Sequence, residues 1–477
     1  MREIPVEQFR RTLEHEALQA AIYTATGRLM KERARVVAPE VLPDFEELRD
    51  QARQIKRHTL DNLDYYLEQF ENAVVKRGGK VVWCKTGKEV VNFLQELAAS
   101  KHARLIVKSK SMTTEEVSLN EQLAHQHVEV VETDLGEYIL QLAGERPYHI
   151  VAPALHKTRY EVGELFRDKL GVEKETVPEK QTAIARRALR EKFLAADIGI
   201  TGANFLVADS GAVVLVTNEG NGRLTTTVPK VHVVVAGLEK LIPRAQALPV
   251  FLKLLGRSAT GQPLTVYTSF LAGPRREGEI DGPEEFYVVL LDNGRTRLLE
   301  DGNKRESLYC IRCGACLNHC PVYRKIGGHN YPWVYSGPIG KIITPQFLGL
   351  AENAWLPFAS SLCGACAEVC PVKIDIPTIL LELRKEEQTL ALRQGKGRAE
   401  RLMFRLWAWV MKRPALYEVL GSIAASVLPC KEGQVWVRDI PAMLNRGPVN
   451  AWLSQRDFPT LPKASFRQIW RKRVAKG

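Results

Sequence analysis

The stretch "KVVWCKTGKEVVNFLQELAASKHARLIVKS", residues 80–109, decides the fold of the central part of the chain. It opens on a short apolar run, continues with apolar residues at helical spacing and closes on a second apolar run. The stretches that follow, up to residue 154, repeat the scheme with "TTEEVSLNEQLAHQ", "VEVVET" and "YHIVAPA". Alternating strands and helices predict an α/β domain, with a parallel sheet covered by helices.

Working outward, the 477 residues divide into four parts. Residues 1–79 carry apolar residues at helical spacing and end on two glycines, so they predict an N-terminal helical segment. Residues 80–300 continue the α/β domain through "GAVVLVTNEG", "KVHVVVAG", "LTVYTSF" and "EFYVVLLDNG". Residues 301–383 hold most of the cysteines, and residues 384–477 form a basic, Trp-rich C-terminal domain, expected to be a packed cap rather than a disordered tail.

Two cysteine motifs lie fifty residues apart. The first reads "YCIRCGACLNHCPV", residues 309–322, and the second "SSLCGACAEVCPV", residues 360–372. When the two are superposed, three cysteines match and Cys310 falls on Ser360. The spacing x2, x2, x3 followed by Pro is that of bacterial ferredoxins, which bind [4Fe–4S] clusters.

In that arrangement the fourth cysteine of each motif binds the other cluster. The motifs therefore predict two crossed metal sites. Site 1 is a [4Fe–4S] cluster with four thiolates, from Cys310, Cys313, Cys316 and Cys370. Site 2 has three thiolates, from Cys320, Cys363 and Cys366. With Ser360 in the fourth position, site 2 is either a [4Fe–4S] cluster with a non-cysteine ligand or a [3Fe–4S] cluster.

Other functions of paired cysteines account for fewer features of these motifs. Zinc also binds paired CxxC motifs, but it does not account for the x2-x2-x3-Pro run or for its duplication. Covalent haem requires CxxCH, which neither copy has. The two remaining cysteines, Cys84 and Cys430, are expected to be buried structural thiols.

The charge of +12 is concentrated at the C-terminal end. Residues 384–477 carry 19 Lys and Arg against 7 Asp and Glu. A basic surface suits nucleic acid, an anionic membrane face or an acidic partner subunit. The sequence has no nucleic-acid-binding signature, no apolar signal segment and no transmembrane run, so we expect a cytoplasmic protein, with peripheral membrane attachment as a variant.

No signature of a nucleotide or dinucleotide site is complete. "GNGRLT", residues 220–225, lacks the third glycine, and "GRSATGQP", residues 256–263, has Gln262 where a P-loop needs Lys. Two polar stretches, residues 107–120 and 199–223, remain as candidate ligand loops. In the first, a capping box of Thr113 or Thr114 with Glu116 is the favoured interpretation.

The cysteine motifs, together with "SKSMTTEEVSLN" and "GITGANFLVADSGAVVLVTNEGN", resemble the lactate utilization protein B family over nearly the whole chain. The resemblance implies an α/β domain of the sugar-phosphate isomerase and CoA-transferase type. It also implies an iron–sulfur electron-transfer role, rather than a catalytic one, in the oxidation of L-lactate to pyruvate for growth on lactate. The same seven cysteines carry over as cluster ligands, and the three-cysteine second motif is normal for the family.

Further expectations concern partners and substrate. The resemblance implies two other lactate-utilization subunits, a cysteine-rich protein like those of heterodisulfide reductase and a smaller protein with the same α/β domain. The electron acceptor remains unidentified. The alternative is a catalytic subunit that binds the 2-hydroxy acid directly, either in the α/β domain or at an open iron of site 2.

Overall fold

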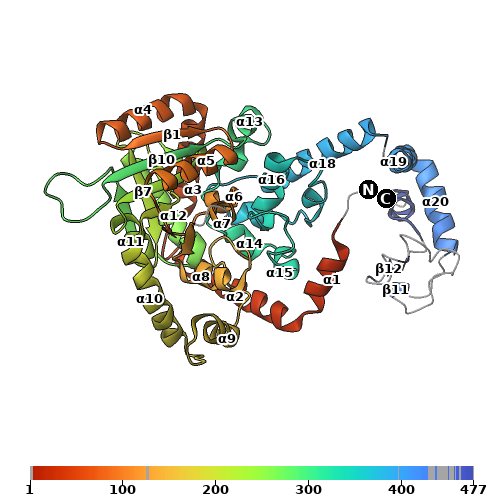
Figure 1. Cartoon of the computed structure of the whole chain (residues 1–477). Coiled ribbons are helices and arrows are strands. Elements are labelled where there is room, and N and C mark those ends of the chain that lie inside the picture. The colour runs from red at the N-terminus through yellow and green to blue at the C-terminus, as the bar shows by residue number, and fades with distance from the viewer. Residues whose placement is uncertain are drawn as a thin grey trace. The chain divides into compact units, whose positions relative to one another are not determined.

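The computed structural model describes residues 4–124, 128–395, 397–427, 436–437, 450, 456, 458–460 and 464–475 (Figure 1). These residues form two compact units, residues 1–387 and residues 388–477. The predicted division into four parts at residues 79, 300 and 383 remains a prediction.

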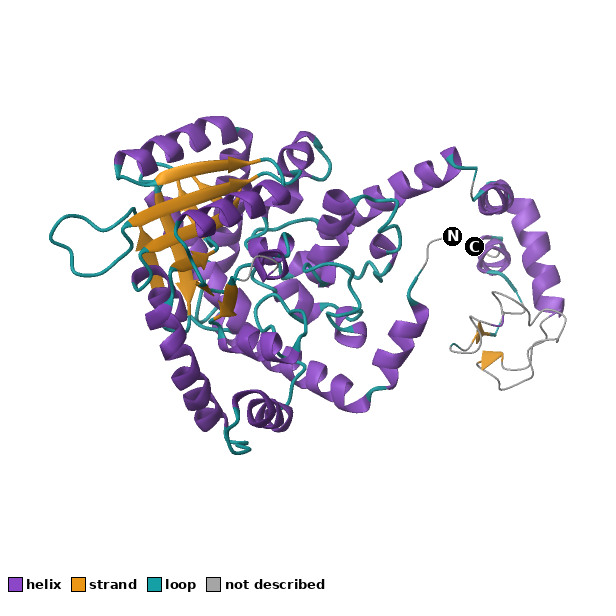
Figure 2. Ribbon diagram, in the orientation of Figure 1, coloured by secondary structure: helices purple, strands orange, loops and turns teal. Residues whose placement is uncertain are grey.

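A six-stranded sheet lies at the centre of the first unit, and all its strands run parallel (Figure 2). Helices flank the sheet, as the alternation in the sequence predicted. In spatial order the strands are β1 (Lys80–Cys84), β10 (Glu285–Leu291), β7 (Val231–Gly237), β4 (Ile198–Thr201), β2 (Leu105–Lys108) and β3 (Glu129–Glu132).

The central strand β7 shows why the sheet is covered on both faces. All seven of its residues are buried, which is typical of a parallel strand between two helical layers. Val231, Val233 and Val235 share a core with one set of helices, whereas Val234 and Ala236 join the core on the opposite face. The helices that follow β1, β2, β3 and β4 are α5 (Gly87–Ser100), α6 (Met112–Glu116), α7 (Leu119–Ala124), α8 (Leu135–Ala143), α9 (Arg159–Leu170), α10 (Pro178–Ala195) and α11 (Asn221–Thr227).

A second, four-stranded sheet takes up the remaining predicted strands. Its order is β8 (Leu241–Ile242), β5 (Phe205–Val207), β6 (Ala212–Thr217) and β9 (Tyr267–Leu271). β6 runs antiparallel to both neighbours, so this sheet is mixed. The adjoining turns and helix are η1 (Leu238–Lys240), η2 (Ala245–Ala247) and α12 (Leu248–Thr260).

The N-terminal part is helical, as predicted. Its helices are α1 (Val6–Glu14), α2 (Glu16–Val36), α3 (Phe45–Asp61) and α4 (Leu63–Lys76). Gly78 has a φ of +86°, a conformation that favours glycine, so the chain turns there before β1 begins.

The stretch "YHIVAPA", residues 148–154, is a turn and not the predicted strand. The Nδ1 atom of His149 accepts hydrogen bonds from the backbone N–H groups of Val151 and Ala152, at 3.1 and 3.2 Å. This side-chain bonding curls the backbone and uses the donors that a sheet would need. The apolar, β-branched residues here pack without forming a strand.

The cysteine motifs lie in a region of short helices that ends in one long helix. These elements are α13 (Arg295–Glu300), η3 (Arg305–Tyr309), α14 (Ala315–His319), α15 (Tyr323–Ile326), α16 (Gly337–Leu348), η4 (Leu356–Phe358), α17 (Ala365–Glu368) and α18 (Ile376–Arg393). Their buried side chains belong to the same apolar core as β5, β6 and α12. The motifs are thus packed into the unit that holds both sheets.

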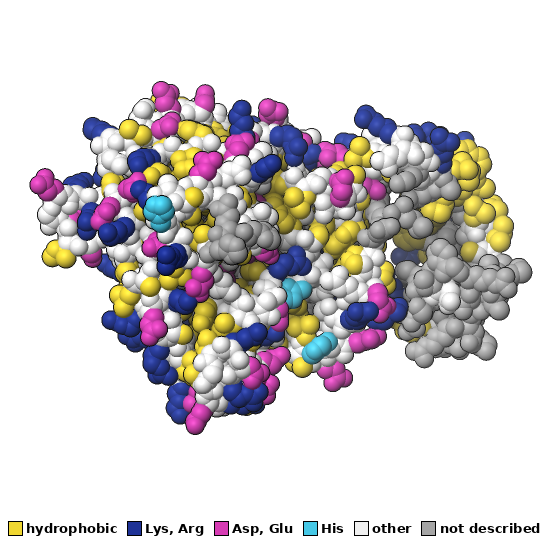
Figure 3. All heavy atoms as spheres, in the orientation of Figure 1, with side chains coloured by type: hydrophobic (Ala, Val, Ile, Leu, Met, Phe, Trp, Pro, Cys, Tyr) yellow, Lys and Arg dark blue, Asp and Glu magenta, His cyan; other side chains and the backbone are white. Residues whose placement is uncertain are grey.

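The second unit contains α19 (Arg398–Met411), α20 (Pro414–Val427), β11 (Trp436–Val437), β12 (Phe458–Pro459) and α22 (Phe466–Val474). The packed cap stays a prediction, and Trp407, Trp409 and Trp470 are about half exposed. Apolar side chains also lie on the surface of α20 (Figure 3). Within the described ranges, no helix combines the length and apolar character needed to cross a membrane.

Candidate metal centres and an adjoining pocket

The two cysteine motifs have the same backbone conformation. Arg312 and Leu362, each just before the first matched cysteine, both have positive φ, +62° and +54°. Gly314 and Gly364 follow at +75° and +82°, and a short helix starts after each glycine. A non-glycine residue at positive φ is uncommon, so its recurrence fifty residues on marks a real structural repeat.

Hydrogen bonds to sulfur recur in the same way. The N–H of Tyr323 donates to Cys320 Sγ, and the N–H of Ile374 donates to Cys370 Sγ, both at 3.4 Å. Such donors stabilise a thiolate and orient it. The last cysteine of each motif is therefore held as a ligand would be.

The four cysteines predicted for site 1 lie around one small cavity. Three of them belong to the first motif and one to the second. The rest of its wall is largely apolar, with Ile150, Ile339 and Ile374 among the lining residues. Four thiols around one closed space fit a cubane cluster, which requires one thiolate for each iron. Ligation itself remains a prediction.

Arginines from the N-terminal helices hold the second motif against site 1. Arg33 of α2 donates from Nη2 to the carbonyl of Val369 at 3.1 Å, and Arg49 of α3 donates from Nε to the carbonyl of Cys370 at 2.9 Å. Both side chains are buried. These contacts could not be predicted from the sequence because more than 300 residues separate the partners.

Site 2 is closer to the surface. Cys320 is buried, Cys366 is half-buried and Cys363 is exposed. Burial, and then the neighbouring Cys320, raise the pKa of the Cys366 thiol to about 12. The buried Lys341 donates from Nζ to Cys320 Sγ at 3.5 Å, so a cation lies against this site.

Ser360 occupies the place of Cys310. Its Oγ accepts a hydrogen bond from the N–H of Leu362 at 3.2 Å, and Cys310 Sγ accepts one from the N–H of Arg312 at 3.4 Å. Arg384 donates to the carbonyl of Ser360 at 3.1 Å and fixes the turn. The Ser360 oxygen therefore accepts the same local hydrogen bond in the second motif that the Cys310 sulfur accepts in the first.

A buried ion-pair network, which sequence reasoning missed, joins site 1 to the α/β domain. Arg295 donates to both carboxylate oxygens of Glu116, at 2.9 and 2.8 Å, and also to Glu239. Burial alone would raise the pKa of Glu239, but Arg295 and Arg312 lower it to about 2. The capping-box prediction for Glu116 is wrong, because Ser111 caps α6 and Glu116 binds Arg295 instead.

The two predicted polar loops meet at one pocket, here called the edge pocket. It has a volume of about 280 Å³ and lies where β2, β3 and β4 end. Its lining includes Lys110, Asp134, Asn204, Glu219, Lys240, Arg312 and Tyr335. Ile150 and Arg312 line both this pocket and the site 1 cavity, so the two spaces are neighbours.

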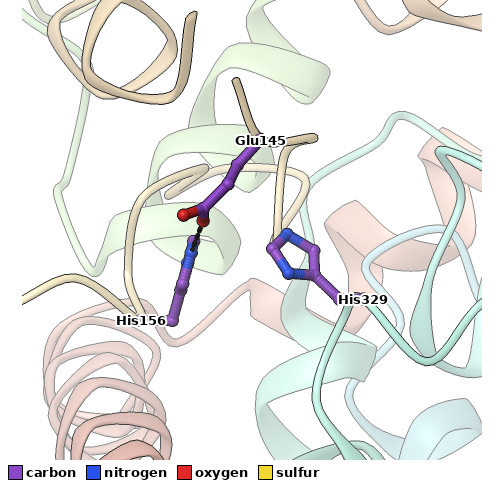
Figure 4. A group of neighbouring side chains, drawn as sticks. All are labelled: Glu145, His156 and His329. Atoms are coloured by element: carbon purple, nitrogen blue, oxygen red, sulfur yellow. Dashed lines mark hydrogen bonds and ion pairs between the residues drawn. The ribbon is translucent and has the colours of Figure 1, made fainter. Parts of the chain in front are cut away.

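Glu145, His156 and His329 form a further group with metal-ligating side chains (Figure 4). His156 Nε2 lies 2.7 Å from Glu145 Oε2, and Lys157 also pairs with Glu145. His329 Nε2 lies 2.7 Å from the carbonyl of Arg146. The ligand atoms already have partners, and the charge of Lys157 opposes a cation, so hydrogen bonding accounts for this group.

The structure describes only one of the two cysteines that lie outside the motifs. Cys84 is buried, as predicted, and burial raises the pKa of its thiol to about 11. Cys430 lies outside the described residues.

Three family models match consecutive parts of the chain. A LUD domain matches residues 67–291, a 4Fe-4S dicluster domain matches residues 306–374, and a model described as Lactate utilisation protein B, C-terminal, matches residues 382–475. The chain is 44% identical over 467 residues to lactate utilization protein B of Bacillus cytotoxicus, covering 98% of this chain and 96% of the relative.

Other relatives agree with this. Lactate utilization protein B of Oceanobacillus iheyensis is 43% identical over 472 residues, covering 99% of this chain and 96% of that one. A crystal structure of a DUF162 family protein from Deinococcus radiodurans matches 48% of this chain and 98% of its own, at 11% identity and a TM-score of 0.28. That similarity is too weak to support an inference.

Proposed function

Because this chain belongs to the lactate utilization protein B family, we propose that it is an iron–sulfur electron-transfer subunit in the oxidation of L-lactate to pyruvate. The name of the relatives supports a role in lactate utilization, and the match to a 4Fe-4S dicluster domain supports iron–sulfur clusters. The finer role, passing electrons between lactate oxidation and an acceptor, is inferred from the two cysteine sites.

The cluster ligands are proposed to be the crossed sets. Cys310, Cys313, Cys316 and Cys370 would hold a [4Fe–4S] cluster at site 1. Cys320, Cys363 and Cys366 would hold a [4Fe–4S] or [3Fe–4S] cluster at site 2, with Ser360 Oγ at the fourth corner. Bound clusters supply one-electron steps, and lactate oxidation releases two electrons, so two adjacent sites can take them in turn.

One observation carries the proposal: one site is enclosed and the other is open to the surface. Of the site 1 cysteines, Cys313 and Cys370 are buried and the other two are half-buried against the core, whereas Cys363 of site 2 is exposed. An electron that enters near the edge pocket would reach site 1 first and leave through site 2. Exchange with a partner requires such an exposed end.

The proposed partners are a cysteine-rich subunit like those of heterodisulfide reductase and a smaller protein with the same α/β domain. The exposed end of site 2 suits docking of a redox partner, and the basic C-terminal unit suits an acidic surface. The final electron acceptor is a further partner of this proposed system.

The test is anaerobic reconstitution of the full chain, followed by iron analysis and a redox titration monitored by EPR. We expect about seven or eight irons per chain and two reducible centres. Fewer than four irons per chain, or clusters that cannot be reduced, would refute the relay. Full reduction of the clusters by lactate only when both partner subunits are present would support it.

The alternative, that this chain binds the 2-hydroxy acid itself, gains support from the edge pocket. That pocket adjoins site 1, and none of the three site 2 cysteines lines it. The observation favours binding in the α/β domain over binding at an open iron of site 2.

A further inference from the structure

We propose that the edge pocket is a binding site for a small carboxylate anion that also bears a hydroxyl group, with Lys240 and Arg312 gripping the carboxylate. The choice of a 2-hydroxy acid as the ligand class rests on the function proposed above. The anion site itself rests on geometry and charge alone.

The position of the pocket is the first argument. Ligands of parallel α/β sheets bind beyond the carboxyl ends of the strands. Ser109–Thr113 follows β2, Asp134 follows β3, Gly202–Asn204 follows β4 and Lys240 follows β7. Four neighbouring strands thus deliver polar residues to one hollow of about 280 Å³.

Arg312 is the second argument, because it has an unused donor. Its side chain is 7% exposed, and its Nη1 has no hydrogen-bond partner in the described part of the chain. Nη2 lies 3.4 Å from Glu239 Oε1, and the guanidinium stacks 4.4 Å from the centre of the Tyr335 ring. A buried donor without a partner is unfavourable, and a ligand carboxylate would satisfy it.

Lys240 is the third argument. It is 8% exposed and lines the edge pocket. Lys240, Arg295 and Arg312 are all buried around Glu239, whereas the carboxylates of the ion-pair network described above are Glu116 and Glu239. The cations therefore outnumber the anions on this wall, and a bound carboxylate would reduce the excess.

Two carboxylates that also line the pocket suit a hydroxyl group. Glu219 and Asp134 lie close together there, and the N–H of Leu135 donates to Glu219 Oε2 at 3.3 Å. Burial, and then the charge of Asp134, raise the pKa of Glu219 to about 7. A ligand that carries both groups would bind the cations through its carboxylate and donate from its hydroxyl to one of these acidic side chains.

The excess positive charge has a competing explanation, since the thiolates of a bound site 1 cluster are also anionic. The test therefore compares ligand affinity with cluster potential. The full-length protein, reconstituted anaerobically, is titrated calorimetrically with sodium L-lactate, with sodium propionate, which lacks the hydroxyl, and with glycerol, which lacks the carboxylate.

We expect lactate to bind, propionate to bind more weakly and glycerol not to bind. The decisive variant is Lys240→Met, which should weaken lactate binding about tenfold or more, the effect of one charge-assisted hydrogen bond. The matched control is Lys230→Met, an exposed lysine before the same strand, which should bind lactate like the wild type. Arg312→Gln should weaken binding similarly; because Arg312 neighbours Cys313, its iron content is checked first.

Two results would overturn the proposal. One is unchanged lactate affinity in Lys240→Met accompanied by a shifted site 1 potential, which would make Lys240 a counter-charge to the cluster. The other is equal affinity for lactate and glycerol. Failure of the relay would appear separately, as clusters that dithionite cannot reduce while the binding isotherm is intact.

Discussion

The two cysteine motifs are the same loop in different surroundings. Both have a residue at positive φ, a glycine, a short helix and an N–H bond to the last sulfur. The arginines of α2 and α3 and a largely apolar wall cover site 1, whereas site 2 has an exposed cysteine and a serine in place of a fourth. The conformation of the loop therefore determines where the ligand atoms lie. The residues that cover the loop determine which site is accessible to a partner protein.

The largest test of this comparison exchanges the crossed ligands. Cys370→Ser should abolish the site 1 cluster and keep site 2, although Cys370 lies in the second motif; Cys320→Ser should do the reverse. Each should remove about half of the bound iron, since each cluster depends on one crossed thiolate. Iron analysis and EPR measure both. If Cys370→Ser removed only the site 2 signal, ligation would be local to each motif.

The thiols of the metal-free protein should react at very different rates. The backbone N–H of Ala365, and then the hydroxyl of Ser361, lower the pKa of Cys363, whereas burial raises the pKa of Cys313. Thiolate is the reactive form, so iodoacetamide at pH 7 should modify Cys363 about tenfold faster or more. Mass spectrometry of timed samples gives the rates. Equal rates would show that site 1 is not enclosed.

Ser360→Cys should make the two sites alike. A hydroxyl is harder to deprotonate than a thiol, so the substitution should give site 2 a fourth thiolate and, if the wild-type site lacks an iron, about one more iron per chain. The control is Ser360→Ala, which removes the oxygen and should make site 2 lose iron faster to a chelator. An EPR spectrum of Ser360→Cys identical to that of the wild type would contradict an unusual fourth corner.

Lys341→Met should produce the smallest effect, confined to site 2. The substitution removes a buried cation and an N–H···S bond at Cys320, which favour the more negative, reduced state. We expect the site 2 potential to fall by about 60 mV, the one-electron equivalent of about 1.4 kcal/mol. Lys325→Met, which replaces an exposed lysine of α15, is the control in the same EPR titration. A shift in the potential of site 1 alone would contradict the assignment of Lys341 to site 2.

Local patterns predicted the elements well where one residue type dictates one conformation. The run "KVVWC" and the helix after it lie where the alternation placed them, and the four cysteines predicted for site 1 line one cavity. "YHIVAPA" failed because the side chain of His149 competes with strand pairing, which β propensity does not include.

Long-range polar contacts were beyond the sequence. Glu116 has the spacing of a capping residue, and only the folded chain shows that it binds Arg295, 179 residues away. Part of the edge pocket was predicted, because both polar loops that line it were candidate ligand loops. Lys240 and Arg312 were missed because they reach the pocket from a turn after β7 and from a cysteine motif.

The arginine contacts of α2 and α3 also determine how late in synthesis this part of the fold can be completed. Arg33 and Val369 are 336 residues apart, and Arg49 and Cys370 are 321 apart. At about 5–20 residues per second, a ribosome needs roughly 16–67 s to cover such an interval. The N-terminal helices must wait that long with these guanidinium groups lacking their final acceptors. A truncated chain that stops before the second motif would have neither Cys370 nor the carbonyls that hold it, so iron loading at site 1 reports that synthesis has passed residue 370.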